Sequence, residues 1–244
     1  MSTWLDHRFW PGYFANVFVP QVTALVDAIE QRVLPGFEHI DQEVDEAAHR
    51  EYERLGQMPA DDSYDMADAA EQAVEAGIDL YQTLRGVRQA LLNVSAAALY
   101  HLFEQQLLVF YRRQGLHARR QNDDSNLNVE ALRSELSTIG INFDGLSSWP
   151  TIVELRLLAN AVKHAEGDSA AKLRKRRPQL YADPSIAKAG LNDLGIPQTI
   201  FMPLAGQDIY VTQDDLARYS SAIASFWKEF GEAVFAHGSG TGAA

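Results

Sequence analysis

Two long segments with helical periodicity, separated by a short polar connector, most constrain what this 244-residue chain can fold into. In residues 20–55, apolar side chains recur every three or four positions, as they do on one face of a helix. Pro35 should break this helix, because proline removes a hydrogen-bond donor and clashes with the preceding turn. Residues 61–113 predict a second long helix with interruptions at Gly77 and Gly86. Long helices joined by a short connector pack antiparallel, so the pattern predicts a helical bundle.

The rest of the chain predicts shorter helices and one small β element. Helical patterns and capping residues indicate further helices over residues 129–139, 149–166, 168–175 and 212–235. Two short apolar runs within residues 199–211 are separated by Ala205-Gly206-Gln207, which predicts a β-hairpin with Pro203 on an edge strand. We therefore expect a mainly α protein. It would form a single helical domain over 1–236, closed by the hairpin and last helix at 198–236, with a disordered tail at 237–244.

Composition excludes several classes of protein. The chain has no cysteine, which rules out disulfides, thiolate zinc sites, iron–sulfur clusters and a cysteine nucleophile. It shows no run of about 18 apolar residues and no secretory pattern at its start, so we expect a cytoplasmic protein without a membrane partner. Glu46 and His49 form one Glu-x-x-His motif, whereas a carboxylate-bridged di-iron site needs two. We expect no metal ion and no other cofactor.

Charge is distributed unevenly along the chain. The formal net charge is −12, and residues 27–79 alone carry 16 acidic and 3 basic residues, a net of −13. This acidic face argues against a protein that coats nucleic acid duplexes and offers a surface to a protein partner. A basic cluster lies elsewhere in the sequence, at Lys163, Lys172, Arg174, Lys175, Arg176 and Arg177. It is either a solvated surface with salt bridges or a footprint for RNA or phosphate.

The segment 149–167 brings together groups suited to phosphate binding and proton transfer. At 3.6 residues per turn, Arg156, Asn160, Lys163 and His164 fall within an arc of about 100° on one side of the predicted helix. A neutral histidine can accept the proton of a ribose hydroxyl, while arginine and lysine stabilise the developing phosphorane charge. The alternative is that these polar residues form the ordinary solvent face of an amphipathic helix.

His101 and Glu104 are polar residues in an otherwise apolar part of the second long helix. They are three positions apart and so share a face. One interpretation is a boundary position with partial access to solvent. The other is a supporting contact to Lys163 or His164 beneath the candidate site.

Motifs of several common enzyme classes are missing. The sequence has no Gly-x-Ser-x-Gly elbow, no Gly-x-x-x-x-Gly-Lys phosphate loop and no Gly-x-Gly-x-x-Gly after a strand. The glycine-rich stretch at residues 238–242 follows a helix instead. These observations disfavour serine hydrolases and enzymes that hydrolyse nucleotides or bind dinucleotides.

Arg156 followed by Asn160-Ala161-Val162-Lys163-His164, together with the long central helix that carries His101 and Glu104, resembles the HEPN superfamily. The resemblance covers about residues 60–170. It implies an all-helical bundle and a homodimer that joins two Arg-x(4–6)-His motifs into one metal-independent ribonuclease cleft. By analogy, Arg156 would hold the phosphate and His164 would act as acid and base, assisted by Asn160 and Lys163. Seven residues separate Arg156 from His164, which departs from the motif.

Two functions from different classes follow. The first is an RNA-binding protein in which Lys172, Arg174 and Arg176 extend the RNA surface. Its catalytic form would be a metal-independent endoribonuclease. The resemblance implies a setting in bacterial defence, including phage defence, or in toxin–antitoxin systems. The second is a non-catalytic interaction or scaffold module that binds a protein through the acidic face of residues 27–79.

Overall fold

Helices account for nearly all of the regular structure in the computed structural model, which describes residues 5–57, 66–114, 128–184 and 199–240. The helices are α1 (Phe9–Tyr13), α2 (Val19–Ala28), α3 (Ile40–Gly56), α4 (Met66–Gln114), α5 (Val129–Thr138), α6 (Trp149–His164), α7 (Asp168–Arg176) and α9 (Gln213–Gly240). Two π-helical turns flank α2, at Phe14–Phe18 and Ile29–Val33. Short 3-10 turns occur at Leu34–Phe37, Phe143–Gly145, Pro178–Tyr181 and Pro203–Ala205. The prediction of a helical protein is confirmed.

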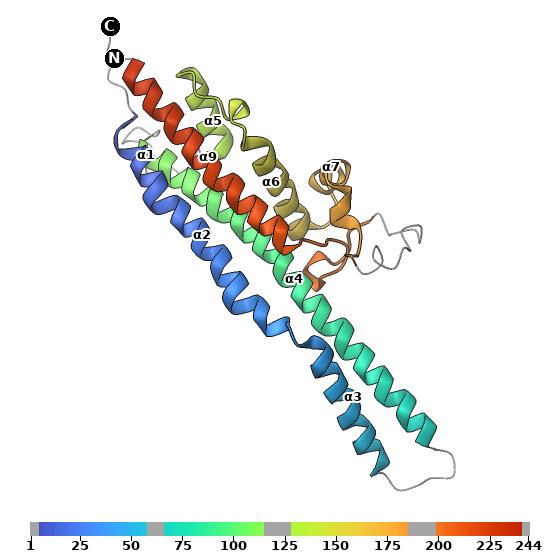
Figure 1. The fold of residues 1–244 in the computed structure, drawn as a ribbon. Coiled ribbons are helices and arrows are strands. Elements are labelled where there is room, and N and C mark those ends of the chain that lie inside the picture. The colour runs from blue at the N-terminus through green and yellow to red at the C-terminus, as the bar shows by residue number, and fades with distance from the viewer. Residues whose placement is uncertain (1–4, 58–65, 115–127, 185–198, 241–244) are drawn as a thin grey trace.

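Helix α4 runs for 49 residues through the whole length of the molecule, as Figure 1 shows. The predicted interruptions at Gly77 and Gly86 are wrong, because the helix continues through both glycines. Each lies where another part of the chain approaches closely. A Cβ atom on Gly77 would be 3.3 Å from the Cβ atom of Ala48 on α3, and one on Gly86 would be 3.0 Å from the carbonyl oxygen of Ala205. Glycine here serves packing between segments and does not end the helix.

An antiparallel pair of helices extends beyond the rest of the molecule. It consists of α3 and residues 66–84 of α4, and we call it the arm (Figure 1). The break before α3 occurs at the 3-10 turn Leu34–Phe37, as the proline in this turn predicts. In the arm, Leu55, Ala69, Ala73 and Gly77 are buried between the two helices. The small residues on the α4 side of this contact give the arm a narrow apolar seam.

An aromatic core joins α1, the π-helical turn Phe14–Phe18, α4 and α9 in the body of the molecule. The rings of Phe14 and Trp227 are 4.7 Å apart, and Phe103 meets Phe226 edge-on at 4.9 Å. Gln106 is a buried glutamine in this core, and its side-chain amide forms three hydrogen bonds. It accepts a hydrogen bond from the Trp227 indole at 2.9 Å and donates to the Phe18 carbonyl and to the Gln21 side chain, both at 3.0 Å.

The predicted β-hairpin at residues 199–211 is wrong, because the described residues form no strand there. The segment is bound to α4 through the buried side chain of Asn93. The side-chain NH₂ group of Asn93 donates to the backbone carbonyls of Pro203 and Ile209, both at 2.9 Å. The side-chain oxygen of Asn93 accepts a hydrogen bond from the backbone N–H of Val211 at 3.3 Å. Backbone groups that a hairpin would pair with each other are thus paired with a side chain more than 100 residues away.

The final helix starts where its capping residues predict and continues further than expected. The Thr212 amide and hydroxyl donate to the Asp215 carboxylate at 3.1 and 2.8 Å, and the Asp215 amide donates back to the hydroxyl. Helix α9 then extends to Gly240, so the predicted disordered tail is wrong for residues 237–240. Residues 241–244 of that tail lie outside the described residues.

One helical stretch of the described residues could cross a membrane by length and composition. It lies within Phe9–Gly56 and contains an 18-residue window with a mean hydropathy of 1.2, of which 28% is buried. For this stretch, the expectation that no segment spans a membrane stays a prediction. Core helices of water-soluble proteins have the same composition, so the cytoplasmic location stays a prediction.

Candidate functional site

The predicted site residues of α6 lie along its surface. Arg156 and Asn160 are partly buried, whereas Lys163 and His164 are exposed at the C-terminal end of the helix. The apolar side of the same helix is buried against the body, at Ile152, Leu155, Leu158, Ala161 and Val162. The sequence pattern thus placed the polar arc correctly on the outside of α6. Both interpretations of this arc, solvent face and binding face, are compatible with such a surface.

Arg156 is engaged within the chain at one end of this arc. Its guanidinium lies 3.5 Å from the Glu130 carboxylate of α5. It also lines a small cavity of about 10 Å³ that it shares with Tyr100 and Trp149 but not with His164. Burial raises the pKa of the Tyr100 hydroxyl above its usual value and the carboxylate of Glu104 adds to this effect, while the charge of Arg156 opposes it. Arg156 therefore faces acidic and aromatic groups, and a phosphate would compete with Glu130 for it.

The other end of the arc is open. Asn160 donates a weak hydrogen bond of 3.3 Å to the Ser169 hydroxyl, whereas Lys163 and His164 have no hydrogen bond or ion pair with any described residue. The chain turns sharply directly after them, because Ala165 has a φ of 56° and a ψ of −127°. A residue with a side chain is strained in this conformation by about 1–3 kcal/mol.

The basic residues that follow α6 have separate structural roles. Arg174 donates to the Glu166 carboxylate at 2.7 Å and lies over the ring of Tyr181. The Glu166 carboxylate also accepts the Ile200 amide at 2.6 Å, and these two bonds, the backbone one first, lower the pKa of Glu166. Arg176 donates to the Pro150 carbonyl at 2.7 Å. Of the predicted RNA-binding residues on α7, Lys172 remains exposed without an ion pair to any described residue.

His101 and Glu104 pair with each other at 3.4 Å, on the part of α4 beside Tyr100. No hydrogen bond or ion pair links either residue to Lys163 or His164 within the described ranges. Both side chains are partly exposed, at 44% and 34%. They therefore match the interpretation of a boundary position better than that of a supporting contact.

The described histidine and acidic side chains show no group of three or more that could hold a metal ion. In the motif Glu46-Ala47-Ala48-His49, the two polar residues do not pair with each other. His49 lies 3.3 Å from Glu53, and Glu46 lies 3.7 Å from Arg50.

Sequence reasoning missed a buried network of charged side chains at the junction of α6, α7 and α9. At its centre lies Glu154, a residue that is 5% exposed. It accepts hydrogen bonds from Arg218, from Arg177 at 3.1 Å and from the Tyr219 hydroxyl at 2.9 Å. Arg176 lies 3.6 Å from the same carboxylate. The signal in the sequence was the position of Glu154, which is next to Leu155 and one turn before Leu158 on the apolar side of α6.

Asp215 extends this network to the start of α9. Its carboxylate accepts a 2.7 Å bond from Arg177 while it also caps the helix through Thr212. Burial alone would lower the pKa of Arg177, but the hydrogen bond and the charge of Asp215 outweigh it, so the pKa is raised. Arginine is the residue suited to such a position, because it keeps its charge and bonds two carboxylates at once. The network joins three helices and has the character of a structural clamp.

Glu229 makes a second carboxylate clamp, between α9 and the start of α6. It accepts bonds from the Ser147 hydroxyl and, at 2.8 and 3.2 Å, from the hydroxyl and amide of Ser148. Burial raises the pKa of Glu229, but the serine bonds outweigh this and lower it. The carboxylate thereby satisfies donors at the N-terminus of α6, where negative charge is favourable.

The geometry thus places the predicted residues on one surface, with an engaged arginine at one end and unpaired basic groups at the other. No protein-family model matches this chain, and a search of curated proteins and of solved structures finds no match to it either. The similarity to the HEPN superfamily stays a hypothesis based on the motif.

Proposed function

We propose that this chain is a non-catalytic helical interaction module whose arm binds a partner protein. The observation that carries this proposal is an apolar stripe on the arm that no described part of the chain covers. Val74, Ile78 and Tyr81 are spaced four and three residues apart on α4, and their exposed fractions are 58%, 49% and 36%. Such spacing places the three side chains on one face of the helix, next to the face that packs on α3.

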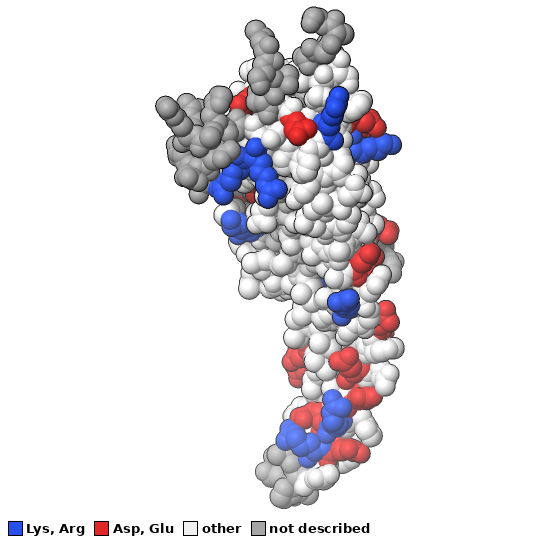
Figure 2. All heavy atoms as spheres, turned by 90° about the vertical axis from the view of Figure 1, so that its left-hand side faces the viewer, with Lys and Arg blue, Asp and Glu red and all other residues white. Residues whose placement is uncertain are grey.

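Acidic side chains border this stripe. The arm carries ten acidic and two basic side chains, a net charge of −8, and Figure 2 shows how Asp and Glu gather at its end of the molecule. On α4, Asp68, Glu71, Glu75 and Asp79 follow a line beside the apolar stripe. A partner suited to this surface is an amphipathic helix with an apolar seam and basic residues along its flank. It would complete a three-helix bundle with the two helices of the arm.

Replacing Val74 and Ile78 together by aspartate should abolish this binding. The probe is a synthetic helix with leucine along one seam and lysine beside it, compared with a scrambled peptide of the same composition. Two more aspartates would strengthen purely electrostatic attraction to a cationic peptide. A loss of affinity of roughly tenfold or more, measured by fluorescence anisotropy, would therefore come from the apolar stripe. The exposure of both valine and isoleucine predicts unchanged helicity by circular dichroism.

The matched control is Val109→Asp, which makes the same change at an exposed valine of α4 outside the arm. It should bind the helical probe like the wild type. Equal affinity of the wild type for the helical and scrambled peptides would contradict the proposal, as would tighter binding by the double aspartate variant.

RNA binding at the end of α6 is the second candidate function, with metal-independent cleavage as its catalytic form. The observation that favours it is that Lys163, His164 and Lys172 pair with none of the described residues, and that the first two directly precede the strained backbone of Ala165. Strained residues are frequent at functional sites. Because Arg156 is paired with Glu130, binding is better supported than cleavage.

Charge reversal at two of these positions, Lys163→Glu with Lys172→Glu, should weaken the binding of single-stranded RNA. It should also make the binding affinity less dependent on salt concentration, because each lysine that contacts a phosphate releases counterions. Filter binding at several salt concentrations measures both effects. Arg32→Glu with Arg113→Glu, which reverses two exposed arginines outside α6 and α7, is the control for total charge. Cleavage would appear as RNA fragments formed in the presence of EDTA and lost in His164→Ala. Indistinguishable RNA retention by the reversed variant and the wild type would remove this candidate.

A further inference from the structure

A second surface, separate from the arm, lies where α9 runs beside α1 and α2. It is an apolar groove of about 590 Å³. The α1–α2 side contributes Pro11, Ala15 and Val19, and α9 contributes mainly Trp227, Gly231 and Phe235. Residues 9–26, which form the first of these sides, contain no charged side chain. The side of the molecule formed by α1 and α2 accordingly shows a broad area without Lys, Arg, Asp or Glu in Figure 2.

One large exposed apolar side chain and several small residues line the groove. Phe235, on the α9 side, is 54% exposed. At Gly231, by contrast, the backbones come close together: a Cβ atom there would be 3.5 Å from Pro11. The same molecule thus presents a protruding phenylalanine and a groove that could receive one from a second copy. An apolar groove rimmed by polar residues is a feature of interaction sites.

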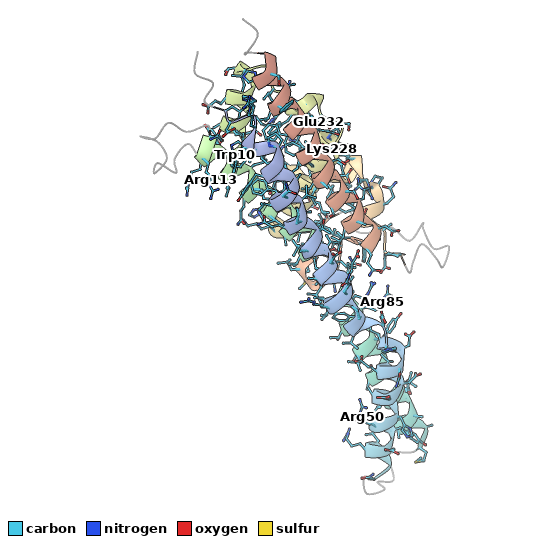
Figure 3. The ribbon with its side chains drawn as sticks, turned by 60° about the vertical axis from the view of Figure 1, so that its left-hand side comes forward. Trp10, Arg50, Arg85, Arg113, Lys228 and Glu232 are labelled. Atoms are coloured by element: carbon cyan, nitrogen blue, oxygen red, sulfur yellow. The ribbon has the colours of Figure 1, made fainter. Side chains whose placement is uncertain are left out.

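The groove contains two charged residues, Lys228 and Glu232. Figure 3 shows them one turn apart on α9. Neither forms an ion pair or hydrogen bond with any described residue. A lysine that precedes a glutamate by four residues is the less favourable order for a pair within one helix. Both charges are therefore available to an opposite charge presented from outside.

We infer that this groove is the interface of a two-fold symmetric homodimer in which the α9 helices of two copies cross antiparallel. An isologous interface requires that the surface be complementary to itself, so that each contact occurs twice. A crossing centred between Lys228 and Glu232 places Lys228 of each copy opposite Glu232 of the other. The same geometry, at 1.5 Å per residue, brings Phe235 of one copy to the Ala224 end of the groove in the other.

This assignment accounts for features that a chain on its own leaves unexplained. The exposed phenylalanine fills the groove, the uncharged α1–α2 side borders the contact, and the two unpaired charges form two ion pairs. A lipid bilayer would also accept the uncharged surface of residues 9–26, but it offers no partner that distinguishes lysine at position 228 from glutamate at 232. The interaction of the arm with a partner protein does not depend on this interface.

A charge-swap experiment tests the two-fold pairing directly. Sedimentation equilibrium should show that the wild type dimerises. Lys228→Glu and Glu232→Lys should each weaken the dimer by roughly tenfold or more, because each places like charges opposite one another twice. The double variant Lys228→Glu with Glu232→Lys should restore it, since the pairs re-form with reversed polarity. Lys175→Glu, an exposed lysine on α7, should dimerise like the wild type.

Three results would overturn the assignment. The first is a wild type that stays monomeric at its highest soluble concentration. The second is single variants that dimerise as tightly as the wild type. The third is a double variant that remains as weak as the single ones, since only reciprocal pairing predicts rescue. Flotation of a monomeric wild type with phosphatidylcholine vesicles would assign the same surface to a membrane instead.

Discussion

Glu154→Ala is expected to lower the free energy of unfolding by about 3–5 kcal/mol, the cost of removing one partner from a buried ion pair. The carboxylate is buried and bonds the guanidinium groups of Arg177 and Arg218 as well as the Tyr219 hydroxyl. Its loss leaves cationic groups partly buried with Asp215 as their remaining carboxylate. Chemical denaturation followed by circular dichroism measures the change.

Two control variants show whether the expected loss of stability comes from the burial and charge of Glu154 or from the loss of any carboxylate. Glu154→Gln keeps the shape and one acceptor oxygen, so it should be less destabilising than alanine but still well below the wild type. Glu130→Gln removes an exposed carboxylate that pairs with Arg133 and Arg156, and it should cost less than about 1 kcal/mol. If Glu154→Ala proved as mild as Glu130→Gln, the buried network would not be the clamp that we describe.

Gly206→Ala should be of similar severity, at roughly 3 kcal/mol or more. The residue has a φ of 76°, and a Cβ atom would overlap the carbonyl oxygen of Gly86 and lie 2.7 Å from its carbonyl carbon. Both atoms belong to the backbone of α4 and cannot turn aside as a flexible side chain could. The segment would have to move off α4, which would leave the buried Asn93 amide without the Pro203 and Ile209 carbonyls.

Gly140→Ala is the matched control for this substitution. Gly140 has a similar φ of 84°, but a Cβ atom there would meet nothing within 4 Å. It should therefore cost only the strain of the left-handed conformation, about 1–2 kcal/mol. The difference between the two variants in urea denaturation isolates the effect of the close approach to α4. Equal losses would show that Gly206 matters only for its backbone conformation.

The regular helices were predicted well because their signals are local. The break at Pro35, the capping pair Thr212 and Asp215, and the apolar periodicity of α6 each depend on residues within one or two turns. Backbone hydrogen bonds in a helix also join residues four apart, so a correct local pattern is enough to predict the element. The polar arc of Arg156, Asn160, Lys163 and His164 was found on the surface for the same reason.

The errors came from contacts between residues far apart in sequence. Gly77 and Gly86 look like helix breakers until the neighbouring segments that approach them are known. The 199–211 segment has the composition of a hairpin, but Asn93 takes up its backbone groups. Arg174 and Arg176 look available to RNA, whereas Glu166 and the Pro150 carbonyl engage them in the fold. In each case a distant partner offers a better-satisfied arrangement than the local one.

The sequence by itself determined that this chain is helical, where its long helices run, and that it separates an acidic region from a basic one. Only the tertiary structure decided which polar groups are paired and which remain available. It buried Glu154 among arginines, paired Arg156 with Glu130, and left the arm stripe and the α9 groove uncovered by any described part of the chain. The physical reason is that helix formation depends on neighbours along the chain, whereas burial and pairing depend on which distant side chains the packed helices bring into contact.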